Sequence, residues 1–232
     1  LSGDAITTGD DNTAVGYNSL GANTTGTQNT VVGSIAGDAI TTGGSNSAFG
    51  YAALGVNSTG DNNTAIGRGS LGNSTASNNS ALGYNALNAN TTGSDNTAVG
   101  YQAGAAVTTG NYNAILGSLA GDALTDADFN VAVGYHALSS DTKGSRSTAI
   151  GQGALFSQNF TSATDTYNTA VGYAAGVNVT TGLRNTISGG LAGDSLTEGN
   201  NNVALGYNSL GADTLGSNTV AIGQGTLQAQ NF

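Results

Sequence analysis

The chain has 232 residues and a formal net charge of −10, with four basic residues and no Pro, Cys, Met or Trp. Nucleic acids and anionic membrane surfaces bind clustered Lys and Arg, so this composition argues against both partners. The lack of Cys excludes disulfides and thiolate metal sites. No apolar run approaches the roughly 18 residues of a transmembrane helix, so we expect no membrane insertion.

One short phrase, NTAVGY, occupies residues 12–17 and returns at 96–101 and 168–173, with near-copies between. The glycine of this phrase, here called the repeat glycine, recurs every 17 residues, apart from one interval of 16 and one of 21. Such a fixed period predicts a repeat architecture in which each unit stacks on its neighbour. The thirteen repeat glycines are Gly16, Gly33, Gly50, Gly67, Gly83, Gly100, Gly117, Gly134, Gly151, Gly172, Gly189, Gly206 and Gly223.

The residues before each repeat glycine predict a short strand with two faces. The residue just before it is large and apolar in twelve of thirteen units, Ser188 being the exception, with Ile187 beside it as a replacement for the lost volume. Asn stands four residues before the repeat glycine in eleven units, and Ser147 and Thr219 take its place in the others. We expect these Asn residues to form an amide ladder that satisfies buried polar groups of the turns: Asn12, Asn29, Asn46, Asn63, Asn79, Asn96, Asn113, Asn130, Asn168, Asn185 and Asn202.

The position four residues after the repeat glycine alternates between Leu, in eight units, and Gly, in five. Each Gly unit carries an aliphatic residue three positions later, where the Leu units are polar. We therefore expect one interior slot that is filled from either of two backbone positions, as close packing requires. The five aliphatic residues are Ile40, Val107, Leu124, Val179 and Leu196.

A unit of 17 residues is too short for a tetratricopeptide, ankyrin or leucine-rich repeat, and its alternation favours strands. The sequence predicts an all-β fold, a parallel β-solenoid of about 13 stacked coils. Residues 1–232 would form a single array with a protruding loop at 156–167. Both ends of the chain fall within the pattern, so we expect a fragment of a longer array.

The phrases NTAVGY, NTAIG and NSALGY resemble the repeats of YadA-like heads in trimeric autotransporter adhesins. They resemble more closely the NTAVGYxAL repeats of bacteriophage and cyanophage tail-fibre proteins. The resemblance covers the whole chain. It implies a left-handed β-roll, three chains side by side, and attachment to a host or surface from an extracellular, cell-surface or virion location.

Oligomerisation also has a physical reason, because a narrow coil buries little apolar surface by itself. An Ala precedes the large apolar residue in most units and points to the opposite face of the strand. We expect this small-residue face to lie against neighbouring chains of a homotrimer, and packing inside a single roll is the alternative. The residues are Ala14, Ala48, Ala65, Ala98, Ala132, Ala170, Ala204 and Ala221.

The sequence contains few residues that could act in catalysis or bind a metal ion. His136 is the one histidine and occupies a variable position, which favours a surface or interface role. The aspartates of the AGD phrases (Asp38, Asp122, Asp194) and the pair Asp126 and Asp128 suit turn caps better than calcium ligands, because the calcium-binding β-roll pattern is absent. We expect no enzyme activity, no metal and no cofactor.

Tyr follows the repeat glycine in seven units and supplies the best candidates for contact with a cell-surface glycan, although these rings could instead cover the turn or pack between chains. A protein receptor is the other candidate partner. Thr-Thr-Gly recurs six times, which raises ice binding by Thr ladders as the alternative function. Asn23, Asn57 and Asn90 fall in N-glycosylation sequons. The tyrosines are Tyr17, Tyr51, Tyr84, Tyr101, Tyr135, Tyr173 and Tyr207.

Overall fold

The structure, a computed structural model, describes residues 2–229; Leu1 and residues 230–232, which the predicted array includes, lie outside the described residues. The chain divides into two compact units, Leu1–Tyr112 and Asn113–Phe232. All regular elements of the described part are β-strands, which confirms the predicted all-β class. Within residues 2–229 there is no helix of the length and hydropathy needed to cross a membrane.

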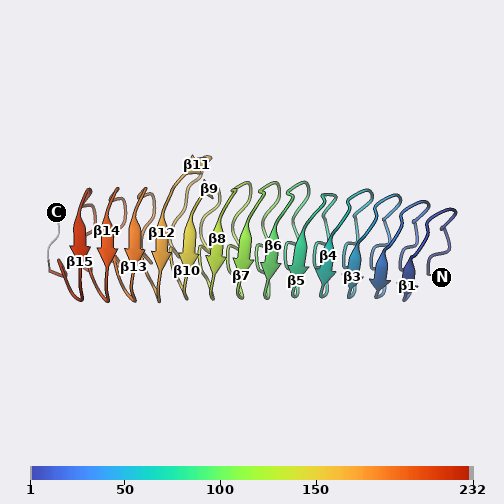
Figure 1. Cartoon of the computed structure of the whole chain (residues 1–232), viewed down its shortest axis with the longest axis horizontal. Helices are drawn as coiled ribbons and strands as arrows, with labels where there is room; N and C mark the ends of the chain where they lie inside the picture. Colours follow the sequence, from blue (N-terminus) through green and yellow to red (C-terminus); the bar gives the residue numbers. More distant parts are fainter. Residues whose placement is uncertain (1, 230–232) are drawn as a thin grey trace. The chain divides into compact units, whose positions relative to one another are not determined.

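Unit 1 contains six short strands that lie side by side in chain order (Figure 1). Neighbouring strands are parallel, and the register pairs the same position of successive repeats, as in Ala65 with Ala81. This in-register pairing is what a fixed repeat predicts. The strands are β1 (Thr13–Val15), β2 (Thr30–Val32), β3 (Ser47–Phe49), β4 (Thr64–Ile66), β5 (Ser80–Leu82) and β6 (Thr97–Val99).

Unit 2 repeats this arrangement and adds a second, smaller sheet. Its main sheet is also parallel and in register, as in Ala149 with Ala170 across the 21-residue interval. The strands are β7 (Ala114–Leu116), β8 (Val131–Val133), β10 (Thr148–Ile150), β12 (Thr169–Val171), β13 (Thr186–Ser188), β14 (Val203–Leu205) and β15 (Val220–Ile222).

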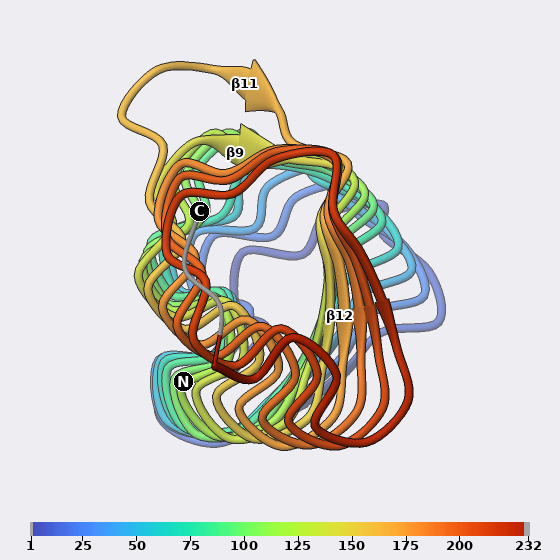
Figure 2. The ribbon, with the colours of Figure 1, turned by 90° about the vertical axis from the view of Figure 1, so that its left-hand side faces the viewer.

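The longer interval supplies the second sheet of unit 2. β11 (Thr164–Asp165) pairs in parallel with β9 (Gly144–Ser145) of the preceding coil. Figure 2 shows β11 and the loop before it outside the ring that the other coils of unit 2 form. The protrusion is thus shorter than the predicted 156–167: β11 and the loop before it lie outside the coil (Figure 2), whereas Gln158 and Thr166 are fully buried, and the pairing of β10 with β12 stays intact.

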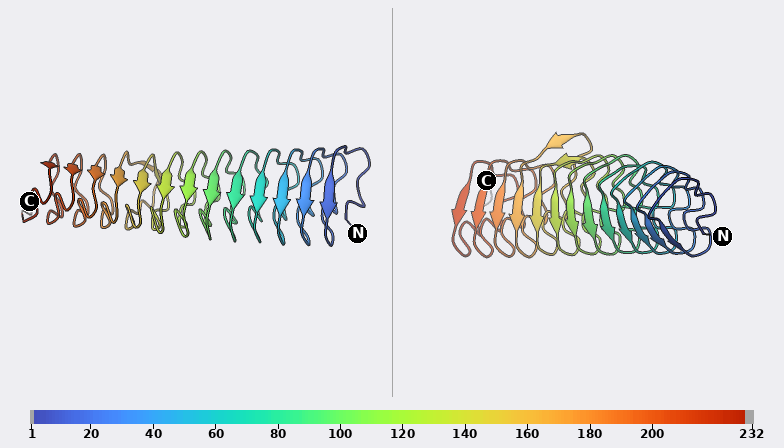
Figure 3. Two further views of the ribbon diagram at one scale, coloured as in Figure 1. Left: turned by 60° about the horizontal axis from the view of Figure 1, so that its bottom comes forward. Right: turned by 45° about the vertical axis from the view of Figure 1, so that its right-hand side comes forward.

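Each coil binds the next through its backbone. The Gly33 amide donates to the Val15 carbonyl at 2.8 Å, and the Thr30 amide donates to the Asn46 carbonyl at 2.8 Å. Figure 3 shows the same stacking within each unit from two further directions. The chain is therefore a parallel β-solenoid of about twelve turns with a 17-residue spacing.

The repeat glycine is required because successive coils approach closely at this point. At Gly50, φ is +137°, and a Cβ would lie 2.7 Å from the carbonyl carbon and oxygen of Gly67. Any other residue would be strained in φ and would clash with backbone that cannot move aside. This is why the phrase keeps its glycine in every unit.

The two faces of the strands are opposite to the prediction. The Ala column points into the coil, where Ala48, Ala65 and Ala98 are fully buried, and the large apolar column points outward. The expected Ala face toward neighbouring chains is thus wrong, and the alternative of packing inside a single roll holds. Ile187 is likewise buried while Ser188 is exposed, so Ile187 does not replace the outward side chain.

The interior slot is filled as predicted. The five aliphatic residues of the Gly units are fully buried, and so are seven of the eight Leu residues, Leu227 near the C-terminal end being half-buried. A Cβ on Gly37 would lie 2.9 Å from Ile40 Cδ1 and 3.4 Å from Val31 Cγ1. Val31 stands at the strand position that is usually Ala. The side chains of this strand position and of the interior slot therefore fill the same space inside the coil. Ile115 and Ile187 enlarge the same column in two other Gly units.

Candidate functional site

The outward surface of the main-sheet strands, here called the sheet face, carries a row of large apolar side chains in each unit. Leu82 in unit 1 is 47% exposed and Leu116 in unit 2 is 49% exposed, although both lie in β-strands. None of the thirteen strands of the two main sheets contains Asp, Glu, Lys or Arg. The large outward residues are Val15, Val32, Phe49, Ile66, Leu82 and Val99 in unit 1, and Leu116, Val133, Ile150, Val171, Leu205 and Ile222 in unit 2.

A second outward row lies two residues earlier in each strand. In unit 1 it consists of hydroxyl-bearing residues that are exposed or half-buried. The hydroxyls of this row can hydrogen-bond to water, whereas the large apolar row beside it cannot. The row in unit 1 is Thr13, Thr30, Ser47, Thr64, Ser80 and Thr97.

The Asn column lies inside the coil and connects successive turns. Asn29 Nδ2 donates to the Gly43 carbonyl at 2.9 Å, and Asn29 Oδ1 accepts from the Asn46 amide at 3.0 Å. The same pattern recurs in unit 2, where Asn185 Oδ1 accepts from the Asn202 amide. The sequence predicted the column correctly but not its geometry, because the bonds run mainly from side chain to backbone and not from amide to amide.

The Asn column is interrupted at Ser147, and Gln158 connects this position to the next Asn of the column. Gln158 lies in the 21-residue interval between Gly151 and Gly172. The Gln158 amide is fully buried; Nε2 donates to Ser147 Oγ at 2.8 Å and to Asp141 Oδ2, while Oε1 accepts from Asn168 Nδ2 at 2.8 Å. Asp141 Oδ1 in turn accepts from the Phe160 amide at 3.0 Å. The protruding loop is thus anchored to the interior at its base.

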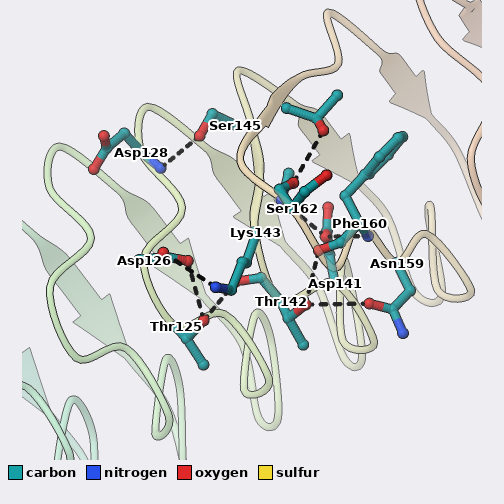
Figure 4. Close-up of polar contacts among 12 residues, drawn as sticks. Thr125, Asp126, Asp128, Asp141, Thr142, Lys143, Ser145, Asn159, Phe160 and Ser162 are labelled. Atoms are coloured by element: carbon teal, nitrogen blue, oxygen red, sulfur yellow. Dashed lines mark hydrogen bonds and ion pairs between the residues drawn. The ribbon is translucent and has the colours of Figure 1, made fainter.

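Thr125 and Thr142 occupy the position that corresponds to the first Thr of the Thr-Thr-Gly phrases, and Figure 4 shows the contacts of both. Thr125 Oγ1 donates to the Thr142 carbonyl at 2.9 Å, and Thr142 Oγ1 donates to the Phe160 carbonyl at 2.8 Å. These hydroxyls bind the next coil and are not a free surface ladder. The second position is exposed but carries Asp126 and Lys143 here, joined by an ion pair at 3.6 Å.

The tyrosine column is outward and exposed in both units, and its rings interact along the stack. Tyr84 and Tyr101 stack with ring centroids 5.5 Å apart and planes 10° apart. Arg68 takes the place of a Tyr between Tyr51 and Tyr84, and its guanidinium carbon lies 5.6 and 5.7 Å from their ring centroids. Contacts along the column therefore run from Tyr51 through Arg68 and Tyr84 to Tyr101 in unit 1, and rings are also open to solvent at Tyr17, Tyr135, Tyr173 and Tyr207.

A hollow of about 210 Å³ opens in unit 2 where the tyrosine column is interrupted by Gln152. His136, Phe156 and Tyr173 line it together with Tyr135. Sequence reasoning did not find this site. The available signal was that His136, Gln152 and Phe156 depart from the repeat in neighbouring coils.

His136 is joined to Asp122 through Ser139. Ser139 Oγ lies 3.0 Å from His136 Nδ1 and also donates to Asp122 Oδ1. A hydroxyl has one proton, so Ser139 accepts from the Nδ1–H of His136, and Nε2 is left as an acceptor. The serine lies between acid and histidine, which is not the order of a nucleophilic triad.

The aspartates of the AGD phrases lie at turns. The carboxylates of Asp38 and Asp194 accept from nearby backbone amides, as turn caps do, yet burial raises the pKa of both above the usual value of 3.8. Within residues 2–229 no group of three His, Asp or Glu side chains is placed to hold a metal ion.

The three sequons at Asn23, Asn57 and Asn90 do not offer exposed acceptors, whereas Asn73, in a further N-x-T sequon, is exposed. Asn23, Asn57 and Asn90 are fully buried, and Asn57 Oδ1 accepts from the Gly60 amide at 2.9 Å. An oligosaccharide could not be carried on these side chains in the folded coil.

Comparison with protein-family models, with characterised proteins and with solved structures finds no match for this chain. The function must therefore be argued from the surfaces described above.

Proposed function

We propose that this chain is a non-enzymatic structural segment of an extracellular fibre, which assembles as a homotrimer through the sheet face. The observation that carries the proposal is the run of exposed or half-buried Val, Leu, Ile and Phe side chains along the strands of each unit, which Ser188 interrupts in unit 2. Monomeric soluble proteins rarely expose contiguous apolar surface of this kind, and such a surface usually marks an interface.

The distribution of charge supports this use of the sheet face. The chain carries 14 acidic residues, and none lies in a main-sheet strand. Charges elsewhere keep the outside of an assembly soluble, while the uncharged strands can approach another chain without desolvating a charge. Removal of the large outward side chains from water would then drive association.

A trimer suits the dimensions of this surface. Strands of three residues give an apolar stripe about 10 Å wide. In each unit, three chains side by side can turn such narrow stripes toward one common axis, which covers all three stripes and leaves the other sides exposed. The resemblance to trimeric adhesin heads and tail-fibre repeats points to the same number, to a left-handed coil and to attachment at a cell surface or virion.

The mass in solution tests the proposal directly. Light scattering after size exclusion should give three times the 22.5 kDa of one chain. Leu82→Glu places a charge on the sheet face and should shift the mass to 22.5 kDa. The matched control is Val56→Glu, because Val56 is 45% exposed but lies outside the strands. A wild-type monomer would refute the trimer, and an unchanged mass for Leu82→Glu would refute the interface.

Ice binding is the second candidate, and the hydroxyl row of unit 1 is the observation in its favour. Thr13 and Thr30 lie one coil apart on the sheet face, and Thr64 follows two coils later with Ser47 between; this row differs from the Thr-Thr-Gly positions. Phe49 and Leu82 interrupt its flatness. A monomer that produces thermal hysteresis, and loses it in Thr30→Lys, would replace the fibre proposal.

A further inference from the structure

Two side chains that depart from the repeat meet in unit 2. His136 stands where other coils have Asn, Ala or Gln, and Phe156 stands where many coils have Gly. Their rings lie 5.7 Å apart in an edge-to-face arrangement, and the ring of Tyr135 lies 4.2 Å from His136. Stacking of coils does not require these aromatic groups, since the other coils stack without them.

The third departure opens a space between two tyrosines. Gln152 replaces Tyr in the coil between Tyr135 and Tyr173. The Gly153 amide donates to the Tyr135 carbonyl at 3.0 Å, and the Ala174 amide donates to the Gln152 carbonyl at 2.8 Å. Two coil spacings separate the tyrosines by roughly 9.6 Å. The Arg68 guanidinium fills the equivalent place between Tyr51 and Tyr84, so a planar or ring-shaped group fits between rings at this spacing.

The floor of this hollow is also open. Gly153 has φ of +66°, and no heavy atom would lie within 4 Å of a Cβ placed on it. Asn occupies this position at comparable φ in other coils, for example at Asn85 and Asn208. The missing side chain at Gly153 and the missing ring at Gln152 together leave the volume of about 210 Å³.

The groups around the hollow are uncharged apart from the titratable His136. Tyr135, Phe156 and Tyr173 line it with aromatic rings, the Gln152 amide carries a donor and an acceptor, and Nε2 of the neutral His136 imidazole is an acceptor. No Asp, Glu, Lys or Arg lines it. Aromatic faces beside neutral hydrogen-bonding groups match a molecule with an apolar face and hydroxyls at its edge.

We propose that this hollow binds one neutral pyranose ring of a glycan, stacked against Tyr173 and Tyr135 and hydrogen-bonded by Gln152 and His136. Aromatic rings also attract organic cations, but a cation without hydroxyls would leave the Gln152 amide and His136 Nε2 without ligand partners, and an acidic sugar would lack a guanidinium or ammonium. The inference rests on the proposed attachment role for its biological meaning, while the site itself needs only the fold of unit 2.

Saturation-transfer NMR on the full chain tests the site with methyl glycosides of glucose, galactose and mannose as probes. At least one should receive saturation, whereas an N-acetylneuraminic acid glycoside and benzyltrimethylammonium should not. Tyr173→Ala should raise the dissociation constant of the responding glycoside by a factor of about three to ten. Gln152→Tyr should abolish binding, because a third ring closes the gap as in the Tyr84–Tyr101 stack.

Matched variants separate the site from general effects. Tyr207→Ala removes a ring of similar exposure, 55% against 58% for Tyr173, outside the hollow and should bind as wild type. His136→Asn restores a residue found in other coils and should weaken binding without loss of fold. The proposal is overturned if no neutral glycoside responds, if only a charged probe does, or if Gln152→Tyr binds unchanged. Light scattering on the same samples reports the trimer independently.

Discussion

Asn63 illustrates how one side chain can bind three successive coils. Its backbone amide donates to Asn46 Oδ1, its Oδ1 accepts from the Asn79 amide, and its Nδ2 donates to the Ala76 carbonyl. All these groups are remote from bulk water, so each would otherwise be a buried polar group without a partner. The Asn column therefore stabilises the turns that the short strands cannot stabilise alone.

We expect Asn63→Ala to lower the free energy of unfolding by about 1–3 kcal/mol, because it leaves the Asn79 amide and the Ala76 carbonyl unpaired. Asn73→Ala serves as the control, since Asn73 is exposed and outside the column, and should change stability by less than about 0.5 kcal/mol. Urea unfolding followed by circular dichroism measures both. Equal effects of the two variants would contradict the role of the column.

Asp194 provides a pH prediction at the same scale. Burial raises the pKa of Asp194, and the backbone amides of Asp194 and Ser195 only partly oppose this. The carboxyl oxygen Oδ1 is buried and has no hydrogen-bond partner. A folded pKa above the unfolded value means that the folded state holds the proton more tightly, so stability is lost as pH rises through the folded pKa.

Asp194→Asn should therefore melt at a slightly higher temperature than wild type at pH 7 and at about the same temperature at pH 3. Thermal unfolding at the two pH values measures the difference. A larger gain at pH 3 than at pH 7 would contradict the sign.

At the scale of the coil, the exchange between Leu and Gly shows how each turn fills its interior. Leu54 has φ of +52°, the same value as Gly37 at the equivalent position. A Leu in this region costs about 1–2 kcal/mol, and its full burial offsets that cost. The Gly units avoid the strain and place an aliphatic side chain three residues later.

This exchange predicts a compensating pair of substitutions. Gly37→Leu alone should destabilise by about 1–3 kcal/mol through overpacking against Ile40 and Val31. Gly37→Leu combined with Ile40→Asn reproduces the pattern of Leu54 and Asn57, and a large part of the loss should be recovered. A double-mutant cycle from chemical unfolding measures the coupling, and additive losses would show that the two positions do not share one slot.

At the scale of the whole molecule, the sheet face and the charged surfaces have separate roles. Association through uncharged side chains should depend little on ionic strength. We expect the mass measured by light scattering to remain three times 22.5 kDa from 0.05 to about 1 M NaCl. Dissociation at high salt would show that ion pairs, and not the sheet face, hold the chains together.

Much of the fold could be predicted because the same residue types recur at the same position of each 17-residue unit. The 17-residue period, the parallel pairing, the Asn column and the shared interior slot all follow from residues that recur at fixed positions. The hollow at His136 could not be predicted, because its residues belong to three coils and become neighbours only once the coils stack. The continuity of one array over residues 1–232 and the number of associated chains stay predictions.

The sequence by itself determined that each unit is a strand and turn stacked on its copy, since identical volumes and turns repeat along the chain. It could not determine which face of the strand is interior. Alternation defines two faces, and the larger side chains would ordinarily be assigned to the core. Only the tertiary structure decided otherwise. The buried Leu or aliphatic slot residue already fills much of each coil, so the inward strand position is Ala in most units, and the larger Val31, Ile115 and Ile187 occur in three of the units whose slot position is Gly.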